Sequence, residues 1–122
     1  VADNCRSAVA AALQAFQRLD ALCNVAAVFI PCHTTEMSAA AWDKTLAVNL
    51  KGPFRLTALI APRMVAAGGG SVINVTSTGA IRPTPDIAPY AAAKGALNIV
   101  TKAHALEYGP SVRVNAIMAG PF

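Results

Sequence analysis

Charged residues are scarce in this sequence. They make up 13% of its 122 residues, whereas an average soluble domain carries about 25%, and 55% of the residues are hydrophobic. The ten basic residues are scattered and form no run, although the net charge is +4, so we expect no nucleic-acid partner. A chain this apolar is expected to bury part of its surface against a second subunit or another part of the same protein.

Cysteines are also few, and they are poorly placed for a disulfide or a metal site. The three are Cys5, Cys23 and Cys32, an odd number without the close spacing of metal or redox pairs. His33 beside Cys32 lacks two further ligands at metal spacing, so we expect no metal. A reducing, cytoplasmic location is the expectation. The longest uncharged run, 64–81, contains the three consecutive glycines 68–70 and several polar residues, which argues against a membrane helix.

Apolar residues at helical spacing alternate along the chain with short, nearly continuous apolar runs. The pattern predicts helices over 3–18, 39–67 and 86–108, and strands over 19–25, 71–76 and 112–117. Such alternation is typical of a doubly wound, Rossmann-like α/β fold, in which helices cover both faces of a parallel sheet. Three strands and three helices are few for this fold. We therefore expect residues 1–122 to form a single, partial domain.

Capping and breaking residues set the expected helix boundaries. The candidate N-caps are Asp3 or Asn4 for the first helix, Ser38 for the second and Asp86 for the third. Pro53 should kink or split the second helix, because proline removes a helical hydrogen bond. The glycines 68–70 should end that helix, and Gly109 should end the third.

A tyrosine and a lysine stand four residues apart on the third expected helix. Tyr90 and Lys94 would share one helix face, with Cβ atoms roughly 5–6 Å apart. A free phenol has a pKa near 10, and a cation within about 4–6 Å favours its ionised form. The pair could therefore exchange protons with a substrate at neutral pH. A surface tyrosine and a surface lysine that merely share a face would give the same spacing.

The ends of the expected strands indicate where a ligand would bind. In open α/β sheets, ligands bind outside the carboxyl ends of the strands. Here those ends present 24–27, 77–80 and 119–121, which should line one crevice. Ser77 and Tyr90 are expected to share it.

Five segments give the sequence a resemblance to a known family. They are 24–27, 48–52, 70–77, 90–94 and 112–117, the last followed by Gly120 and Pro121. Their order and spacing resemble those of the short-chain dehydrogenase/reductase family, and together they span almost the whole chain. The resemblance is to the carboxyl-side, catalytic portion of the family, without the amino-terminal βαβ portion that binds the nucleotide.

The resemblance implies an oxidoreductase that interconverts a secondary alcohol and a ketone with NAD or NADP. Tyr90 would be the general acid or base, and Lys94 would assist it and hold the nicotinamide ribose. Ser77 would bind the reacting oxygen, and Asn49 would position a water in a proton relay. The residues implied in cofactor binding are Asn24, Ala26, Tyr90, Lys94, Gly120 and Pro121. A homo-oligomer, a dimer or a tetramer, is also implied.

Departures from the family pattern leave other functions open. Ala27 stands where the family has glycine, Ala119 stands where it has proline, and no Gly-x-x-x-Gly-x-Gly phosphate loop precedes the first helix. One alternative is a truncated, non-catalytic module for binding or assembly. Another is a hydrolase with Ser77 as nucleophile, although the residues around Ser77 form neither Ser-x-x-Lys nor a Gly-x-Ser-x-Gly elbow.

Overall fold

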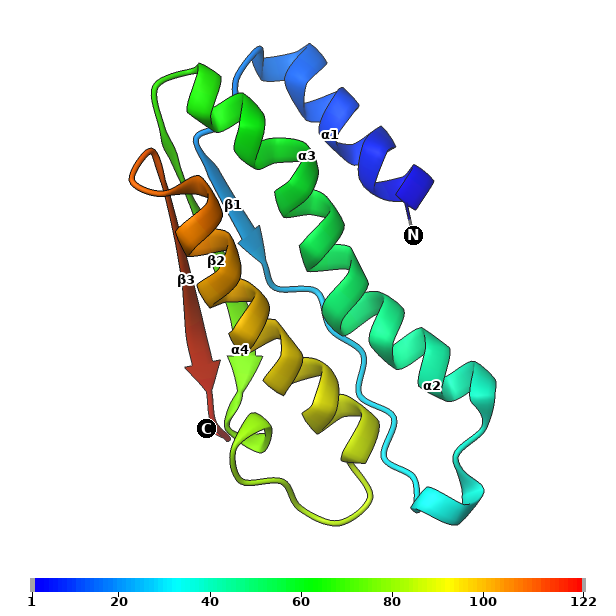
Figure 1. Cartoon of the computed structure of the whole chain (residues 1–122). Helices are drawn as coiled ribbons and strands as arrows, with labels where there is room; N and C mark the ends of the chain where they lie inside the picture. Colours follow the sequence, from blue (N-terminus) through cyan, green and yellow to red (C-terminus); the bar gives the residue numbers. More distant parts are fainter. Residues whose placement is uncertain (1, 122) are drawn as a thin grey trace.

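Three parallel strands form one layer of the molecule, with the helices packed against it (Figure 1). The computed structural model describes residues 2–121, so residues 1 and 122 of the expected domain lie outside the described part. The strands are β1 (Ala21–Asn24), β2 (Gly70–Ser77) and β3 (Val112–Ala119), in the order β1-β2-β3. Asn24 pairs with Asn74, and Ser77 pairs with Ala119. The predicted parallel sheet is confirmed, and the carboxyl ends of β2 and β3 meet at one edge.

Helices connect the strands and cover one face of the sheet. They are α1 (Ala2–Phe16), α2 (Ala39–Leu46), α3 (Gly52–Ala66) and α4 (Ala88–Tyr108), with a π-helical turn η2 (Ala47–Lys51) and the 3-10 turns η1 (Thr34–Glu36) and η3 (Thr78–Ala80). In Figure 1, α3 and α4 lie on the same side of the sheet, and α1 packs against α3.

The sequence led us to expect helices on both faces, and within residues 2–121 the helices occupy only one. Right-handed crossovers that advance in the same direction place their helices on the same face. The order β1-β2-β3 contains no reversal of direction, and helices reach the second face only where the strand order reverses.

Burial along the strands agrees with this arrangement. On β3, Val112 and Val114 are 1% and 5% exposed, whereas Ile117, which points to the opposite face, is 57% exposed. The buried core cluster comprises Val9, Ile60, Met64, Val72, Val112 and Val114. The core therefore lies between the sheet and the helices, and the other face of β3 is open in the described residues.

The expected N-cap of the second helix is confirmed, and that of the third helix is wrong. The Oγ atom of Ser38 accepts a hydrogen bond of 3.1 Å from the backbone N–H of Ala41, as an N-cap does. Asp86 does not cap α4, which begins at Ala88, and Asp86 has a positive φ of 68°. Pro89 in the first turn of α4 lacks the N–H that a capping side chain would bind.

The other boundaries differ from expectation by small shifts. The helix α1 already contains Ala2, so Asp3 and Asn4 lie inside it and neither is its N-cap. Near Pro53, where a kink or a split was predicted, the chain stays helical, but the π-helical turn η2 interrupts the α-helical hydrogen bonding between α2 and α3. Gly68 and Gly69 follow α3 with φ values of 102° and 134°, a left-handed backbone that ends the helix.

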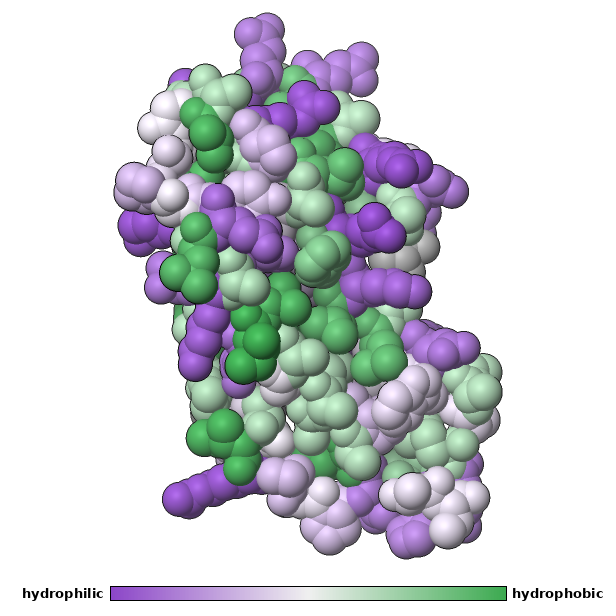
Figure 2. Space-filling view, viewed as in Figure 1, coloured by the Kyte–Doolittle hydropathy of each residue, from purple (hydrophilic) through white to green (hydrophobic). Residues whose placement is uncertain are grey.

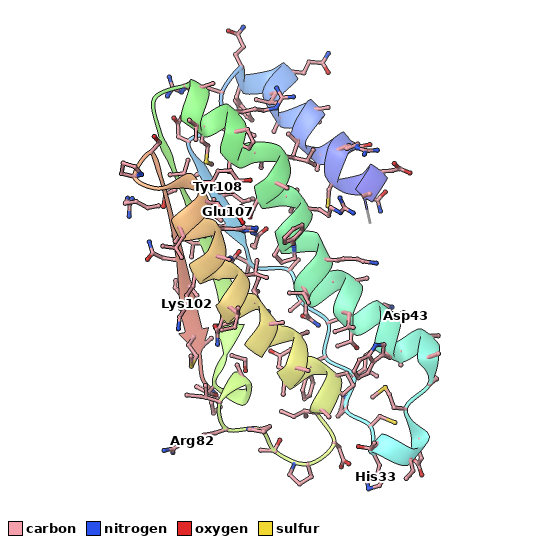
Figure 3. The ribbon with its side chains drawn as sticks, in the orientation of Figure 1. His33, Asp43, Arg82, Lys102, Glu107 and Tyr108 are labelled. Carbon is pink, nitrogen blue, oxygen red and sulfur yellow. The ribbon has the colours of Figure 1, made fainter. Side chains whose placement is uncertain are left out.

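A buried histidine joins α4 to α3. His104 is 3% exposed, and its ring lies 5.2 Å from that of Phe54 and 5.9 Å from that of Tyr108, measured between centroids. Burial lowers the pKa of His104 from the ordinary value of 6.5, and Glu107 opposes this only in part. Figure 3 shows Glu107 and Tyr108 at the end of α4. The folded protein therefore favours the neutral imidazole.

Acid should for this reason weaken the packing of α4. A pKa that is lower in the folded state means that the unfolded chain binds the proton more readily, so stability falls as the pH drops below about 6.5. The variant His104→Phe keeps an aromatic ring at this position and should lose that part of the pH dependence. Urea unfolding midpoints, measured above and below pH 6.5 for both proteins, check this. Equal losses in the two proteins would contradict it.

Candidate active site

A cavity of about 500 Å³ opens at the carboxyl ends of β2 and β3, beside the start of α4. Five of the site residues expected from the sequence line it together: Ser77, Tyr90, Lys94, Gly120 and Pro121. They come from β2, from α4 and from the chain directly after β3. The structure thus gathers residues from distant parts of the sequence at the edge where a parallel sheet binds ligands.

The tyrosine and the lysine converge rather than diverge. Lys94 Nζ lies 5.9 Å from the centroid of the Tyr90 ring. Lys94 is only 2% exposed, and its Nζ donates a hydrogen bond of 2.7 Å to the backbone carbonyl of Val75. Burial lowers the pKa of Lys94 from its ordinary value of 10.5. The carbonyl of Val75 therefore fixes a buried amine beside a half-buried phenol.

The hydroxyl of Ser77 is held by the turn that follows β2. Its Oγ atom accepts a hydrogen bond of 3.1 Å from the backbone N–H of Gly79 and so caps η3. A hydroxyl is both a donor and an acceptor, so Ser77 can still donate its hydrogen to an oxygen in the cavity.

Asn49 lies away from the cavity wall and holds a loop in place. Its side chain is fully buried within η2. Its Nδ2 donates to the backbone carbonyls of Val28 at 2.8 Å and Thr45 at 2.9 Å, and its Oδ1 accepts from the N–H of Val28 at 3.2 Å. The carboxamide of Asn49 thus binds both backbone groups of Val28. Its role in a water relay stays a prediction.

The two residues expected to bind cofactor from β1 and the loop after it lie apart from the cavity. Asn24 is 6% exposed, and its Nδ2 donates to Asn74 Oδ1 at 2.8 Å, while Asn74 Nδ2 donates to Thr101 Oγ1 at 2.9 Å. This buried chain of hydrogen bonds ties β1 and β2 to α4. Asn24 and Ala26 line a smaller neighbouring cavity of about 250 Å³. Their cofactor contacts stay predictions.

The cavity also includes residues that the sequence did not single out. Phe29, Arg82, Thr84 and Ile87 all line it. The ring of Phe29 meets that of Tyr90 edge to face, with centroids 5.0 Å apart and an interplanar angle of 85°. An aromatic residue shortly after the carboxyl end of a strand was the available signal, but nothing in the sequence shows that the loop returns to α4.

The lining of the cavity is basic and otherwise uncharged. Among the described residues, no Asp or Glu lines it, and the charged side chains are Lys94 and Arg82. Figure 3 shows the Arg82 side chain directed away from the body of the molecule. No group of three or more His, Cys, Asp or Glu residues that could hold a metal occurs within residues 2–121.

The fold is Rossmann-like, the architecture of dinucleotide-binding oxidoreductases. The chain belongs to the short-chain dehydrogenase/reductase family: the family model described as short chain dehydrogenase matches residues 1–122. It is 40% identical over 115 residues to 2,5-dichloro-2,5-cyclohexadiene-1,4-diol dehydrogenase of Sphingobium indicum. This alignment covers 93% of this chain and 46% of that protein. The chain is 32% identical over 116 residues to NAD-dependent glycerol dehydrogenase of Listeria innocua, which covers 94% of this chain and 46% of that protein.

A solved structure agrees with the family assignment. The protein from Sinorhizobium meliloti, assigned to the short-chain alcohol dehydrogenases, superposes with a TM-score of 0.95 at 34% sequence identity. The match covers 99% of this chain and 48% of the other. The chain therefore spans about half the length of the relatives that it matches. Within residues 2–121, no helix combines the length and the apolar character needed to cross a membrane.

Proposed function

We propose that the protein is an NAD- or NADP-dependent oxidoreductase that interconverts a secondary alcohol and a ketone. The observation that carries the proposal is the cavity at the carboxyl ends of the strands, which Ser77, Tyr90 and Lys94 line together. A hydrogen-bond donor, a proton donor and a cation around one space can bind and protonate a carbonyl oxygen while a nicotinamide supplies the hydride. The relatives named above are dehydrogenases, one of them described as NAD-dependent.

Each side chain has a separate task in this reaction. Ser77 donates a hydrogen bond to the carbonyl oxygen and stabilises the negative charge that develops there. Tyr90 gives the proton of its hydroxyl to that oxygen during reduction and takes it back during alcohol oxidation. The ammonium group of Lys94, held by the Val75 carbonyl, favours the phenolate that this exchange leaves behind.

The donors present fit the nicotinamide half of a dinucleotide. Lys94 uses one N–H on Val75, which leaves two for the hydroxyls of a sugar. Gly120 and Pro121 line the same cavity from the end of β3 and would contact the ring. The nicotinamide supplies or accepts the hydride when it is bound. The residues that would bind the phosphates are not evident within residues 2–121, because no glycine-rich loop precedes a helix there.

A coupled assay tests the proposal. The complete encoded protein is mixed with NADH or NADPH and a panel of ketones, and then with NAD or NADP and the matching secondary alcohols, while absorbance of the reduced nicotinamide is followed. We expect reversible turnover with at least one pair. If the protein binds the dinucleotide but turns over none of these substrates, it is a binding module and not an oxidoreductase.

We further propose that the protein forms a homo-oligomer through α3 and α4. Large apolar side chains stay exposed on these helices: Phe54 at 43%, Val65 at 42%, Ile99 at 64% and Leu106 at 86%. Figure 2 shows hydrophobic side chains gathered along this face. Since monomers rarely expose large contiguous apolar patches, light scattering of the complete protein should give a dimer or a tetramer. A monomer at micromolar concentration would contradict this.

We also propose a reducing, cytoplasmic location, since Cys5, Cys23 and Cys32 are free thiols.

A further inference from the structure

Phe29 combines exposure with a fixed position. It is 56% exposed, which is a large exposed fraction for a phenylalanine, and it lines the cavity that contains Ser77, Tyr90 and Lys94. One side of its ring contacts the ring of Tyr90 at a right angle. The rest of the ring stays free to contact something that enters the cavity.

The loop that carries Phe29 is held on both sides of it. On one side, the buried carboxamide of Asn49 binds the N–H and the carbonyl of Val28. On the other side, the N–H of Cys32 donates to the carbonyl of Asp86 at 2.8 Å, close to the start of α4. A ring whose backbone is fixed at two nearby points needs little ordering when a ligand binds. Phe29 is therefore a preformed wall of the cavity.

The rings of Phe29 and Tyr90 lie at 85° to one another and form an apolar corner in the wall of the cavity. Ile87, which is 8% exposed, also lines the cavity and adds to its apolar surface. Of the two cations, Lys94 is bound to Val75, and Arg82 is directed outward. The wall of the cavity next to the Tyr90 ring thus offers a flat aromatic face, whereas the charge of Lys94 is held at the Val75 carbonyl.

We infer that Phe29 is a specificity-determining residue that packs against a flat apolar ring of the substrate. It would select ketones and secondary alcohols whose reacting carbon lies in such a ring or next to one. Aromatic faces contact planar apolar groups over a large area, and a single apolar contact in a pocket changes discrimination between substrates by about 10–200-fold. This inference rests on the proposed function and names the substrate class of the same cavity.

Kinetics with two ketones test the inference. Acetophenone carries a flat ring beside its carbonyl, and butanone does not. In the complete protein, we expect Phe29→Ala to raise KM for acetophenone by about ten-fold or more and to change KM for butanone by less than about two-fold. Phe29→Leu, which keeps volume without planarity, should lie between the two. Phe16→Leu is the matched control, because Phe16 is 74% exposed at the end of α1 and does not line the cavity.

The alternative outcomes are distinct. Equal losses with both ketones would mean that Phe29 only positions Tyr90, and unchanged kinetics would mean that it contacts nothing; either result overturns the inference. A rise in KM for the dinucleotide alone would assign the ring to the cofactor and also overturn it. If the wild-type protein reduces no ketone at all, the proposed function fails instead.

Discussion

The variant Tyr90→Phe is expected to lose almost all turnover, with kcat/KM lower by about 10²–10⁴-fold. The substitution removes one oxygen, the atom that exchanges the proton. It keeps the ring, whose centroid lies 5.0 Å from that of Phe29. The cavity should therefore keep its shape, and dinucleotide binding should change little. Steady-state kinetics in both directions, with binding followed by nicotinamide fluorescence, would measure the effect.

The chain supplies its own control for this variant. Tyr90 and Tyr108 are its two tyrosines, and both lie on α4. Tyr108 contacts His104 near the end of the helix and does not line the cavity. Tyr108→Phe should therefore keep near wild-type kcat/KM. Retained activity in Tyr90→Phe would remove Tyr90 from the mechanism, whatever the control shows.

The variant Lys94→Met should separate activity from stability. Loss of the ammonium group removes the cation that stabilises the negative charge formed at the Tyr90 oxygen during proton transfer, so kcat/KM should fall by about 10²–10³-fold. KM for the dinucleotide should also rise, because the donors for the ribose are lost.

Stability should respond differently. Burial lowers the pKa of Lys94, so the folded state disfavours its charged form. That cost is present at neutral pH and is relieved only as the pH rises through the lowered pKa towards 10.5. Methionine has no charge to bury, and this gain offsets the lost hydrogen bond to Val75, which is worth about 1.5–3 kcal/mol. We expect the Tm of the variant to be close to that of the wild type or above it.

Lys102→Met is the matched control. Lys102 is exposed on the same helix, and Figure 3 shows it on the outer side of α4. We expect this variant to change neither the kinetics nor the pH profile. If Lys94→Met and Lys102→Met behave alike, the buried amine has no special role.

Much of the fold was predictable because local chemistry decides it. Ser38 binds an orphan N–H, Pro53 interrupts the helical hydrogen bonds, and the glycines after α3 adopt positive φ, each within a few residues of its own position. Asp86 was misjudged because its φ of 68° depends on how the loop reaches Pro89. The face that the helices occupy was also misjudged, because strand order, rather than the alternation of elements, determines it.

The candidate site divides in the same way. The helical spacing of Tyr90 and Lys94, and the position of Ser77 at a strand end, were sufficient to predict that these residues line one cavity. The carbonyl that holds Lys94 and the amide pair that links Asn49 to Val28 join segments far apart in the chain. No local pattern reports such contacts, so the wall that Phe29 forms was visible only in three dimensions.

The bare side of the sheet bears on how the molecule is made. While β3 is emerging from the ribosome, Ile117, which is 57% exposed in this structure, would face water. Within residues 2–121, β1 and β3 are the two edges of the sheet, and edge strands offer unpaired backbone groups. Nascent chains with apolar surface and open edges tend to aggregate or to be bound by chaperones. Covering that side would therefore lower the tendency of newly made copies to aggregate.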